Sequence, residues 1–371
     1  MYNESIRTRL CVLCLLSALV LLAACSDTGK VAAPASSANE KSQKTYQWRL
    51  ITTWPKNLPG LGLGPENLAN RVREMSNGRL DIKVYGAGEL VGAFEVFDAV
   101  SQGTAQMGHG AAYYWRGKMP VAAMFATVPF GMNAQEMNAW LHYGGGMALW
   151  QRLYEPFNLI PLAAGNSGVQ MAGWFNKEIK SVADLKGLRM RIPGLGGEVL
   201  QRAGGVPVAL PGSDVFTSLQ TGVIDATEWV GPYNDLALGL QNVAKYYYYP
   251  GWHEPGPTLE AIVNKEAWES LPRDLQLMVE TAARMVNEDM LSEFVARNNA
   301  ALQTLLNEHD VQLRRLPDDV IERLRSLSQQ VVKETAGDDP LAQEIYASYM
   351  QFLADVKAWH EISEQAYLNV R

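Results

Sequence analysis

The sequence predicts an α/β fold, and three features of the chain indicate it. Segments that alternate like β-strands are interleaved with segments that carry apolar residues at helical spacing, between residues 46 and 227. Long amphipathic helices dominate from residue 265 onward. The chain has 371 residues, of which 47% are hydrophobic and 19% are charged, and this length suits two domains or two lobes.

The first folded segment is predicted to be a strand–helix–strand unit. Residues 48–52 alternate enough to form a strand, and residues 65–75 place Leu68 and Val72 on one helical face. Residues 80–85 form the next strand. A strand, a crossing helix and a second strand predict a parallel βαβ unit.

The same alternation continues along the chain. Further helices are expected at 94–102, 181–186 and 213–221, and further strands at 106–108, 188–192, 223–227 and 246–249. The long helices are expected at 267–287 with a continuation toward 307, at 318–334 and at 341–367, with prolines marking starts or breaks.

The N-terminus predicts export and lipid attachment. Two arginines precede an apolar run at 10–22, which is too short to span a bilayer and has the length of a signal-peptide core. The run ends in LAAC at 22–25, which resembles a bacterial lipobox with Cys25 as the lipidated first mature residue. A plain signal peptide cut after Ala24, or an uncleaved anchor, is the alternative. Ser26 after the cysteine favours the outer membrane.

The remaining composition excludes several classes of protein. All three cysteines lie within residues 1–25, so the mature domain has no disulfide. Residues 26–45 are small and polar and predict a flexible tether. The formal net charge of −7, without a basic block, argues against nucleic acid.

Several catalytic motifs are incomplete. The glycines at 60–64 lack the last glycine of a dinucleotide motif and the Lys-Ser/Thr of a P-loop. HYGGG at 142–146 has no G-x-S-x-G to supply a nucleophile. The five histidines are scattered without H-E-x-x-H, so a zinc site is not expected. An enzyme is therefore not predicted.

Four features remain, each at the end of a strand-like run: Arg191, Gln170, the pair Glu228-Trp229, and Glu254. Ligands of open α/β sheets bind at the carboxyl ends of strands. A guanidinium matches a carboxylate with two parallel hydrogen bonds. Carboxylate, carbonyl and amide oxygens suit a hard cation.

Each of these residues also has an ordinary structural explanation. Arg191 can form a structural ion pair, and the amide and carboxylates can be exposed. Arg189 lies on the same strand face as Arg191 by two-residue alternation, so the sequence leaves open which arginine faces a cleft.

The motifs around these residues resemble the extracytoplasmic solute receptors of TRAP transporters, the DctP-type family. The runs that carry the resemblance are KSVADLKGLRMR at 180–191 and LQTGVIDATE at 219–228. EWVGPYND at 228–235 and YYYYPGWHEPG at 246–256 are similar to the branch that binds 2-oxo acids such as pyruvate.

The resemblance implies a two-lobed periplasmic binding protein of the Venus-flytrap type, with long bridging helices and a helical C-terminal extension. We expect the first lobe to comprise residues 46–167 and about 257–305. The second lobe would comprise residues 168–256 and about 306–371, including the C-terminal helices. These helices either pack on their own lobe or form a helix-swapped homodimer, which the branch contains.

The resemblance also implies roles for the candidate residues. Arg191 matches the arginine that clamps the ligand carboxylate, and a cation bridges ligand and protein. The residues that match the cation ligands are Gln170, Glu228, Trp229 through its carbonyl, and Glu254. Gln170, Trp229 and one of Tyr113 or Tyr114 match positions at the ligand.

The identity of the cation is open at this point. Two glutamates and a ligand carboxylate carry −3 and Arg191 carries +1, so sodium would leave −1 and calcium would leave no charge. Charge favours calcium, whereas the resemblance to pyruvate receptors favours sodium, which we take as the prediction.

The expected function is capture of a short 2-oxo monocarboxylate in the periplasm and its delivery to TRAP membrane permease subunits. A calcium-dependent receptor for a 2-hydroxy acid such as lactate, or a solute sensor without a transport role, is the alternative.

Overall fold

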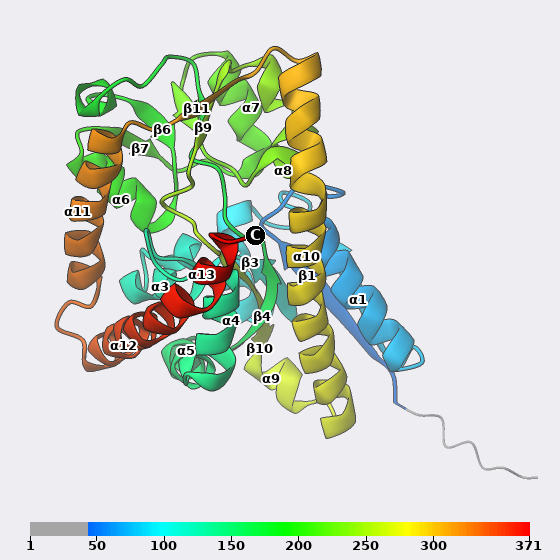
Figure 1. Cartoon of the computed structure of the whole chain (residues 1–371). Coiled ribbons are helices and arrows are strands. Elements are labelled where there is room, and N and C mark those ends of the chain that lie inside the picture. The colour runs from blue at the N-terminus through cyan, green and yellow to red at the C-terminus, as the bar shows by residue number, and fades with distance from the viewer. Residues whose placement is uncertain (1–43) are drawn as a thin grey trace, which may run out of the picture. The chain divides into compact units, whose positions relative to one another are not determined.

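The computed structural model describes residues 44–371, and these contain two mixed β-sheets (Figure 1). The first sheet has the order β2 (Leu80–Tyr85), β1 (Tyr46–Thr52), β3 (Met107–Gly110), β10 (Thr258–Asn264) and β4 (Leu159–Asn166). The second has the order β11 (Gln312–Arg315), β9 (Tyr246–Tyr249), β5 (Gly173–Phe175), β8 (Ala226–Thr227), β6 (Arg189–Arg191) and β7 (Val206–Val208). The lipobox at 22–25, with Cys25, lies outside the described residues.

The predicted parallel unit at the start of the first sheet is confirmed. Strands β1 and β2 are parallel, with Trp48 opposite Ile82, and helix α1 (Leu63–Met75) connects them. Leu68 and Val72 are buried on the inner face of α1, as their spacing predicts. Strand β10 runs antiparallel to both β3 and β4 and completes the sheet.

Each sheet with its packed helices is called a lobe below. The first lobe contains α1, α2 (Val96–Ser101), α3 (Ala123–Ala126), α4 (Ala134–Tyr143), α5 (Gly146–Tyr154) and α9 (Lys265–Glu269). The second lobe contains α6 (Gly194–Arg202), α7 (Gly212–Gln220), α8 (Pro232–Ala237) and α11 (Asp318–Thr335). The fold is therefore the α/β, two-lobed architecture that the sequence predicts.

Helix α10 (Arg273–Glu308) connects the two lobes and runs alongside both of them (Figure 1). It packs on β4 and α1 of the first lobe and on α8 of the second. The sequence predicted a helix from residue 267 with Pro272 as a possible start or break, and in the structure α9 ends at Glu269 and α10 begins after Pro272. Proline lacks an N–H and fits the first turn of a helix, which explains the break.

Two extended segments also cross between the lobes. Residues 167–172 connect β4 to β5, and residues 250–257 connect β9 to β10. They lie side by side, because the Gln170 N–H donates to the Glu254 carbonyl at 3.1 Å. Gly251 has no room for a side chain here, since a Cβ would lie 2.1 Å from the Gln170 carbonyl oxygen.

The C-terminal helices differ from the predicted lobe assignment. Helix α12 (Pro340–Ile362) packs on α3, α4 and α5 of the first lobe rather than on the second. The hydroxyl of buried Tyr349 accepts the Met132 N–H at 2.9 Å, and Arg152 donates to Glu344 at 2.7 and 2.8 Å. The buried aromatic anchor, more than the exposed ion pair, thus holds α12 on the first lobe.

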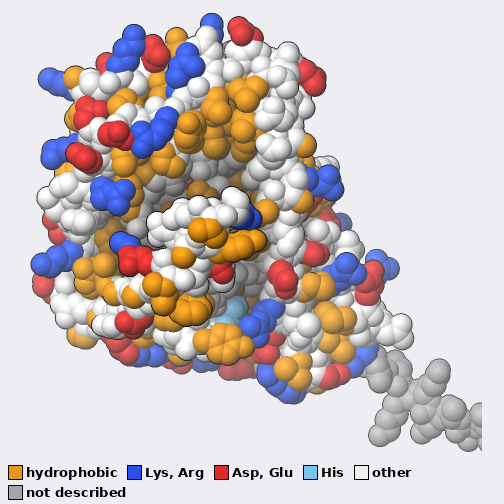
Figure 2. Space-filling view, in the orientation of Figure 1, with side chains coloured by type: hydrophobic (Ala, Val, Ile, Leu, Met, Phe, Trp, Pro, Cys, Tyr) orange, Lys and Arg blue, Asp and Glu red, His pale blue; other side chains and the backbone are white. Residues whose placement is uncertain are grey.

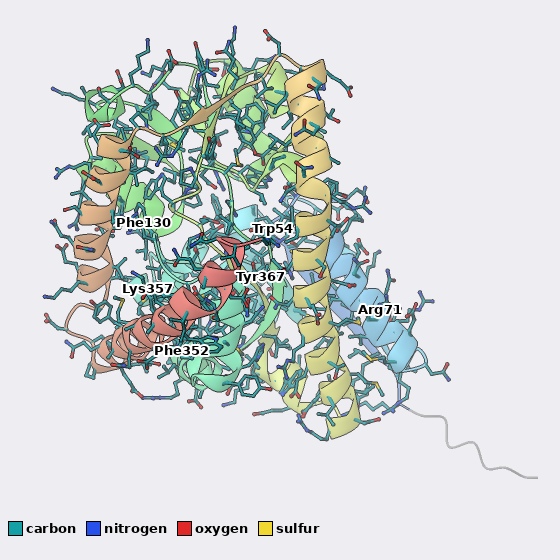
Figure 3. The ribbon with its side chains drawn as sticks, viewed as in Figure 1. Trp54, Arg71, Phe130, Phe352, Lys357 and Tyr367 are labelled. Carbon is teal, nitrogen blue, oxygen red and sulfur yellow. The ribbon has the colours of Figure 1, made fainter. Side chains whose placement is uncertain are left out.

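The distal end of this segment is apolar and exposed. Helix α12 and the short α13 (Glu364–Leu368) lie across the face shown in Figure 2, where hydrophobic side chains gather over them. Figure 3 labels Phe352, Lys357 and Tyr367 along the same two helices. Among residues 44–371, no helix combines the length and the apolar character needed to cross a membrane.

Candidate functional site

A small cavity lies between the two lobes and contains most of the predicted site residues. The lining residues come from both lobes and from a crossing segment: Trp54, Leu61, Tyr113, Tyr114, Ser167, Gln170, Arg191, Trp229, Val230 and Leu259. A site of this composition is mainly apolar and aromatic, with a few polar groups that can orient a ligand.

Arg191 supplies the cationic group of the cavity and is only 2% exposed. Its guanidinium donates to the Leu210 carbonyl at 3.2 Å, to the Glu228 carbonyl at 3.3 Å and to the Glu228 carboxylate. It also donates to the Tyr114 hydroxyl at 3.3 Å, which joins the two lobes. Burial lowers the pKa of Arg191, but the charge of Glu228 and the smaller effects of Tyr114, Tyr113 and Glu254 together outweigh this, so the net pKa is raised.

The ambiguity between the two arginines of β6 is resolved by position along the strand. Arg189 begins the strand, is partly exposed, and pairs with Asp225 at 2.8 Å. Arg191 ends the strand, at the edge where the carboxyl ends meet the cavity. Both share a face, but only Arg191 lines the cavity.

Three buried side chains next to Arg191 present oxygen atoms: Gln170, Glu228 and Glu254. The Gln170 amide nitrogen donates to Ser167 at 3.1 Å, and this leaves its oxygen, Oε1, without a partner. One Glu254 oxygen, Oε2, is also buried without a partner. Buried polar atoms are usually satisfied, so these two oxygens are candidates for coordinating an ion.

The charge balance of this cluster favours a cation. Burial raises the pKa of Glu254 well above its usual value, and the nearby Glu228 charge raises it further. When both carboxyls are ionised they face a single guanidinium, which leaves one negative charge uncompensated and explains why the pKa of Glu254 is raised. A cation bound between the carboxylates would remove that repulsion.

The residues present therefore fit a metal ion. The predicted donors are the side chains of Gln170, Glu228 and Glu254, together with the Trp229 carbonyl. This oxygen set suits a hard cation such as sodium or calcium.

One member of the cluster was missed in the sequence. His253 is 1% exposed, and its Nε2 lies 3.4 Å from Glu228 Oε2. Ligand atoms of Glu228, His253 and Glu254 all lie within 4.8 Å of one another. The five histidines are scattered along the sequence, but His253 directly precedes Glu254, and that adjacency was the available signal.

The aromatic wall was only partly predicted. Both Tyr113 and Tyr114 line the cavity, and burial raises the pKa of Tyr114 to about 12, so both stay neutral hydroxyls at ordinary pH. Trp54 was not predicted, although it lies only two residues after the end of β1. Its ring lies edge-on to Trp229, with 6.4 Å between centroids.

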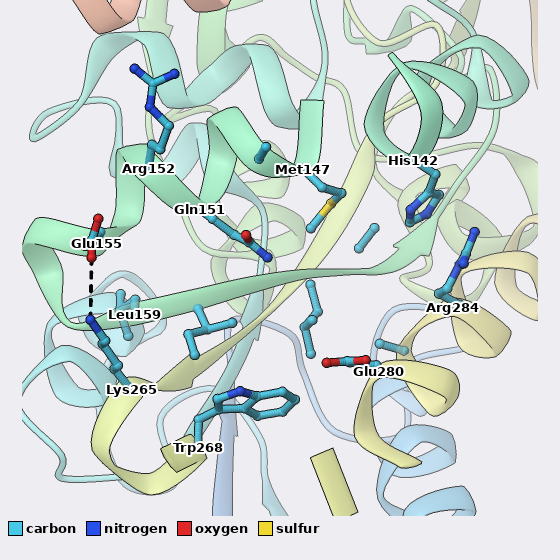
Figure 4. Close-up of a pocket in the computed structure, with 15 residues that line it drawn as sticks. His142, Met147, Gln151, Arg152, Glu155, Leu159, Lys265, Trp268, Glu280 and Arg284 are labelled. Atoms are coloured by element: carbon cyan, nitrogen blue, oxygen red, sulfur yellow. Dashed lines mark ion pairs between the residues drawn. The ribbon is translucent and has the colours of Figure 1, made fainter. Parts of the chain in front are cut away.

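A second, more open pocket lies on the first lobe and contains none of the predicted site residues. It is formed by α5, β4, α9 and α10, and Figure 4 shows charged and apolar side chains together around it. Glu155 and Lys265 pair across one end at 3.5 Å. None of the buried oxygens without a partner belongs to it, so the cavity between the lobes is the better candidate.

The fold and the cavity define a two-lobed binding protein with its ligand site enclosed between the lobes. The model of the DctP family, bacterial extracellular solute-binding protein family 7, matches residues 52–338. The chain belongs to this family of solute-binding proteins. The family membership confirms the predicted resemblance and the prediction of a binding protein rather than an enzyme.

Three similar proteins carry more detailed descriptions. The monocarboxylate 2-oxoacid-binding periplasmic protein of Nostoc sp. is 44% identical over 353 residues, which cover 95% of each chain. A TRAP periplasmic solute-binding protein from Pseudoalteromonas atlantica T6c, with bound sodium and pyruvate, is 43% identical with a TM-score of 0.85. That match covers 88% of this chain and 99% of the other.

The third is a TRAP solute-binding protein from Bordetella bronchiseptica RB50, which is 39% identical with a TM-score of 0.86. The match covers 88% of this chain and 97% of the other. That structure is a mixed-occupancy dimer, with copurified calcium and picolinate in one active site and an apo second site.

Proposed function

We propose that this TRAP solute receptor captures a short 2-oxo monocarboxylate, such as pyruvate or 2-oxobutyrate, together with a cation. The observation that carries the proposal is the cavity itself, where Arg191 lies beside two buried oxygens without partners. Arg191 would bind the ligand carboxylate with its planar fork. A 2-oxo acid adds a keto oxygen next to that carboxylate, so it can chelate a cation that an ordinary monocarboxylate holds less well.

The proposed cation ligands are Gln170, Glu228, the Trp229 carbonyl and Glu254. Tyr113 and Tyr114 would contact the ligand from the first lobe, and the direct bond from Arg191 to Tyr114 favours Tyr114 for the polar contact. Sodium is the proposed ion, because a 43% identical protein binds it with pyruvate. Calcium is the alternative, supported by the formal charge balance and by the calcium of the Bordetella protein.

The proposal extends to the way the receptor is presented. Export by the N-terminal segment and lipid attachment at Cys25 would hold it at a periplasmic membrane surface, the outer membrane being favoured by Ser26. The receptor would then deliver its ligand to TRAP membrane permease subunits.

A homodimer is proposed through the C-terminal helices. The support is the exposed apolar end of α12 and α13 and the dimeric state of a 39% identical relative. A helix swap would exchange the contacts that α12 makes with α4 and α5 between two copies.

A thermal-shift screen tests the ligand class. The segment from Lys44 to Arg371, which forms one compact unit, would be stripped of metal. It would then receive pyruvate, 2-oxobutyrate, lactate, succinate or sialic acid, each with sodium or calcium. A ligand that binds only the folded state raises the melting temperature by mass action.

The expected result is the largest shift with pyruvate or 2-oxobutyrate in the presence of a cation. A larger shift with lactate and calcium would assign the 2-hydroxy acid alternative instead. A shift with succinate that no cation changes would contradict both the ligand class and the ion site. Membrane permease genes next to the receptor gene would support transport over a sensor role.

A further inference from the structure

The loop that carries Glu228 and Trp229 is attached to both lobes by two consecutive buried side chains. Asn234 is 0% exposed and Asp235 is 1% exposed, and both lie in helix α8 just after the loop. Neither was singled out in the sequence. Their hydrogen bonds run in opposite directions, one set into the second lobe and the other toward the first.

Asp235 fixes the loop within the second lobe. One carboxylate oxygen accepts the N–H groups of Val230 and Gly231, each at 3.1 Å. The other accepts the Trp174 indole N–H at 2.9 Å and the Tyr247 hydroxyl at 2.8 Å. Trp174 and Tyr247 belong to strands β5 and β9, so the loop is joined to the middle of the second sheet.

Asn234 connects the same loop to the first lobe. Its side-chain oxygen accepts the Trp229 indole N–H, and its amide nitrogen donates to the carbonyl of Pro59. Pro59 lies between β1 and α1 of the first lobe. An indole N–H only donates and a carbonyl only accepts, so one orientation of the amide satisfies both partners.

Trp229 links this bridge to the ligand cavity. Its ring lies under the Arg191 guanidinium, 5.0 Å from Cζ to the ring centroid, and it is edge-on to Trp54 of the first lobe. The indole therefore contacts the proposed carboxylate clamp on one side and Asn234 at its N–H. Trp229 is one of the two groups that Asn234 binds, and Pro59 of the first lobe is the other. A change in the position of Trp229 therefore disturbs the bridge between the lobes.

We propose that Asn234 is a positioning residue that couples an occupied ion and ligand site to closure of the two lobes. The inference rests on the proposed function of the same cavity. A ligand can reach the enclosed cavity only when the lobes separate, and separation removes Pro59 from Asn234. When ligand and ion hold Trp229 in place, the hydrogen bond from its indole orients Asn234 toward Pro59. The closed state is therefore favoured after binding rather than before it.

The kinetic consequence is specific. A contact made only in the closed state slows ligand release and leaves capture by the open state unchanged. The substitution N234L keeps a similar volume and leaves the Trp229 N–H and the Pro59 carbonyl without partners. We expect the dissociation rate of pyruvate, with saturating cation, to rise about 10- to 100-fold while the association rate changes less than about threefold.

A double-mutant comparison separates coupling from a merely structural role. W229F keeps an aromatic ring but removes the indole N–H, so it breaks the same bridge. If Trp229 and Asn234 act in series, pyruvate dissociates from W229F/N234L much less rapidly than the product of the two single increases in dissociation rate predicts. The matched control is R116Q, because Arg116 bridges the lobes to the Gly194 carbonyl at 2.7 Å without touching Trp229. In the double variant R116Q/W229F, the two single increases in dissociation rate should multiply.

Stopped-flow tryptophan fluorescence on the whole receptor measures all these rates. An unchanged dissociation rate in N234L, or a loss confined to the association rate, would overturn the proposal. Full multiplicative effects in W229F/N234L would also overturn it. If the unmodified protein binds none of the acids with either cation, the proposed function fails and this inference fails with it. Normal binding by the unmodified protein with an unchanged dissociation rate in N234L is a different outcome, which overturns this inference alone.

Discussion

Arg191 and Arg189 occupy the same face of the same three-residue strand, yet their surroundings differ completely. Arg191 is buried among oxygen acceptors in the cavity, whereas Arg189 pairs with Asp225 at the surface. Exposed ion pairs contribute little to stability, while a buried guanidinium with several acceptors has no equivalent replacement. The two positions therefore form a matched pair for testing the carboxylate clamp.

R191K should weaken pyruvate binding by at least about tenfold, because lysine keeps the charge but loses the planar fork that binds both carboxylate oxygens. R189K should leave the affinity within about twofold of the unmodified protein, since surface ion pairs are worth little. Isothermal titration with saturating cation measures both affinities. Equal effects of the two substitutions would show that Arg191 has no special part in binding.

The buried carboxyl of Glu260 leads us to expect that the stability of the fold depends on pH, independently of the ligand site. This carboxyl accepts the Trp115 indole N–H and the Tyr154 hydroxyl, the latter at 2.8 Å. Burial raises its pKa from 4.5 to about 7, although both hydrogen bonds lower it. The folded state therefore keeps a proton that the unfolded state loses.

The sign follows from proton linkage. Below pH 4.5 both states are protonated, and between 4.5 and about 7 only the folded state binds the proton, so stability decreases as the pH rises through this window. The loss contributed by Glu260 is about 3 kcal/mol in total. Urea unfolding at pH 5 and pH 7.5 should show a smaller loss in E260Q than in the unmodified protein. The same loss in both would contradict this account of Glu260.

At the residue scale, the sequence predicted the polar part of the site better than its walls. Arg191 and Glu228 could be singled out because they end or directly follow a strand, whereas Gln170, expected at a strand end, lies in the segment that crosses between the lobes. Trp54 and Leu61 could not be singled out, because isolated apolar residues in a loop look the same in a cavity wall and in a core. Asn234 depends on a partner 175 residues away, Pro59, which no local pattern shows.

At the scale of elements, the C-terminal helices carry the clearest prediction about assembly. Trp359 is 60% exposed and Ile362 is 74% exposed near the end of α12, and α13 adds further exposed apolar residues. Adjacent exposed apolar side chains of this size are typical of an interaction surface.

The double substitution W359E/I362E should convert the proposed dimer to a monomer, because it places two charges in an apolar interface. V295E is the control, since Val295 is a comparably exposed apolar residue, 69% exposed, on a different helix, α10. Light scattering after size exclusion measures the mass of each. A protein that is already monomeric, or a dimer that survives the double substitution, would contradict the proposed interface.

The elements that the sequence predicted share a periodic pattern, and two of the strands it missed lack one. The unit of β1, α1 and β2 has alternating strands and an amphipathic helix. All seven residues of β10 are buried, and β4 is nearly as buried, so neither strand shows polar alternation. The lobe assignment of α12 was wrong for a different reason, since the short connection at 336–339 does not show on which lobe the following helix packs.

At the scale of the whole molecule, the proposed ion ligands lie where the lobes connect. Gln170 and Glu254 belong to the two crossing segments, which hydrogen-bond to each other, and Glu228 belongs to the second lobe. Tyr114 reaches Arg191 from the first lobe. An ion bound at these positions would contact both hinge segments and the second lobe at once, so cation, ligand and closure would be linked in one equilibrium.

The most direct test of this account is isothermal titration of pyruvate into the metal-stripped receptor, in potassium buffer, with and without added sodium or calcium. The account predicts that pyruvate binds only when a cation is present, and that E254Q greatly weakens the cation requirement together with the affinity. Pyruvate binding of equal strength without sodium or calcium, unaffected by E254Q, would contradict the central claim that the ligand is held jointly by Arg191 and a bound ion.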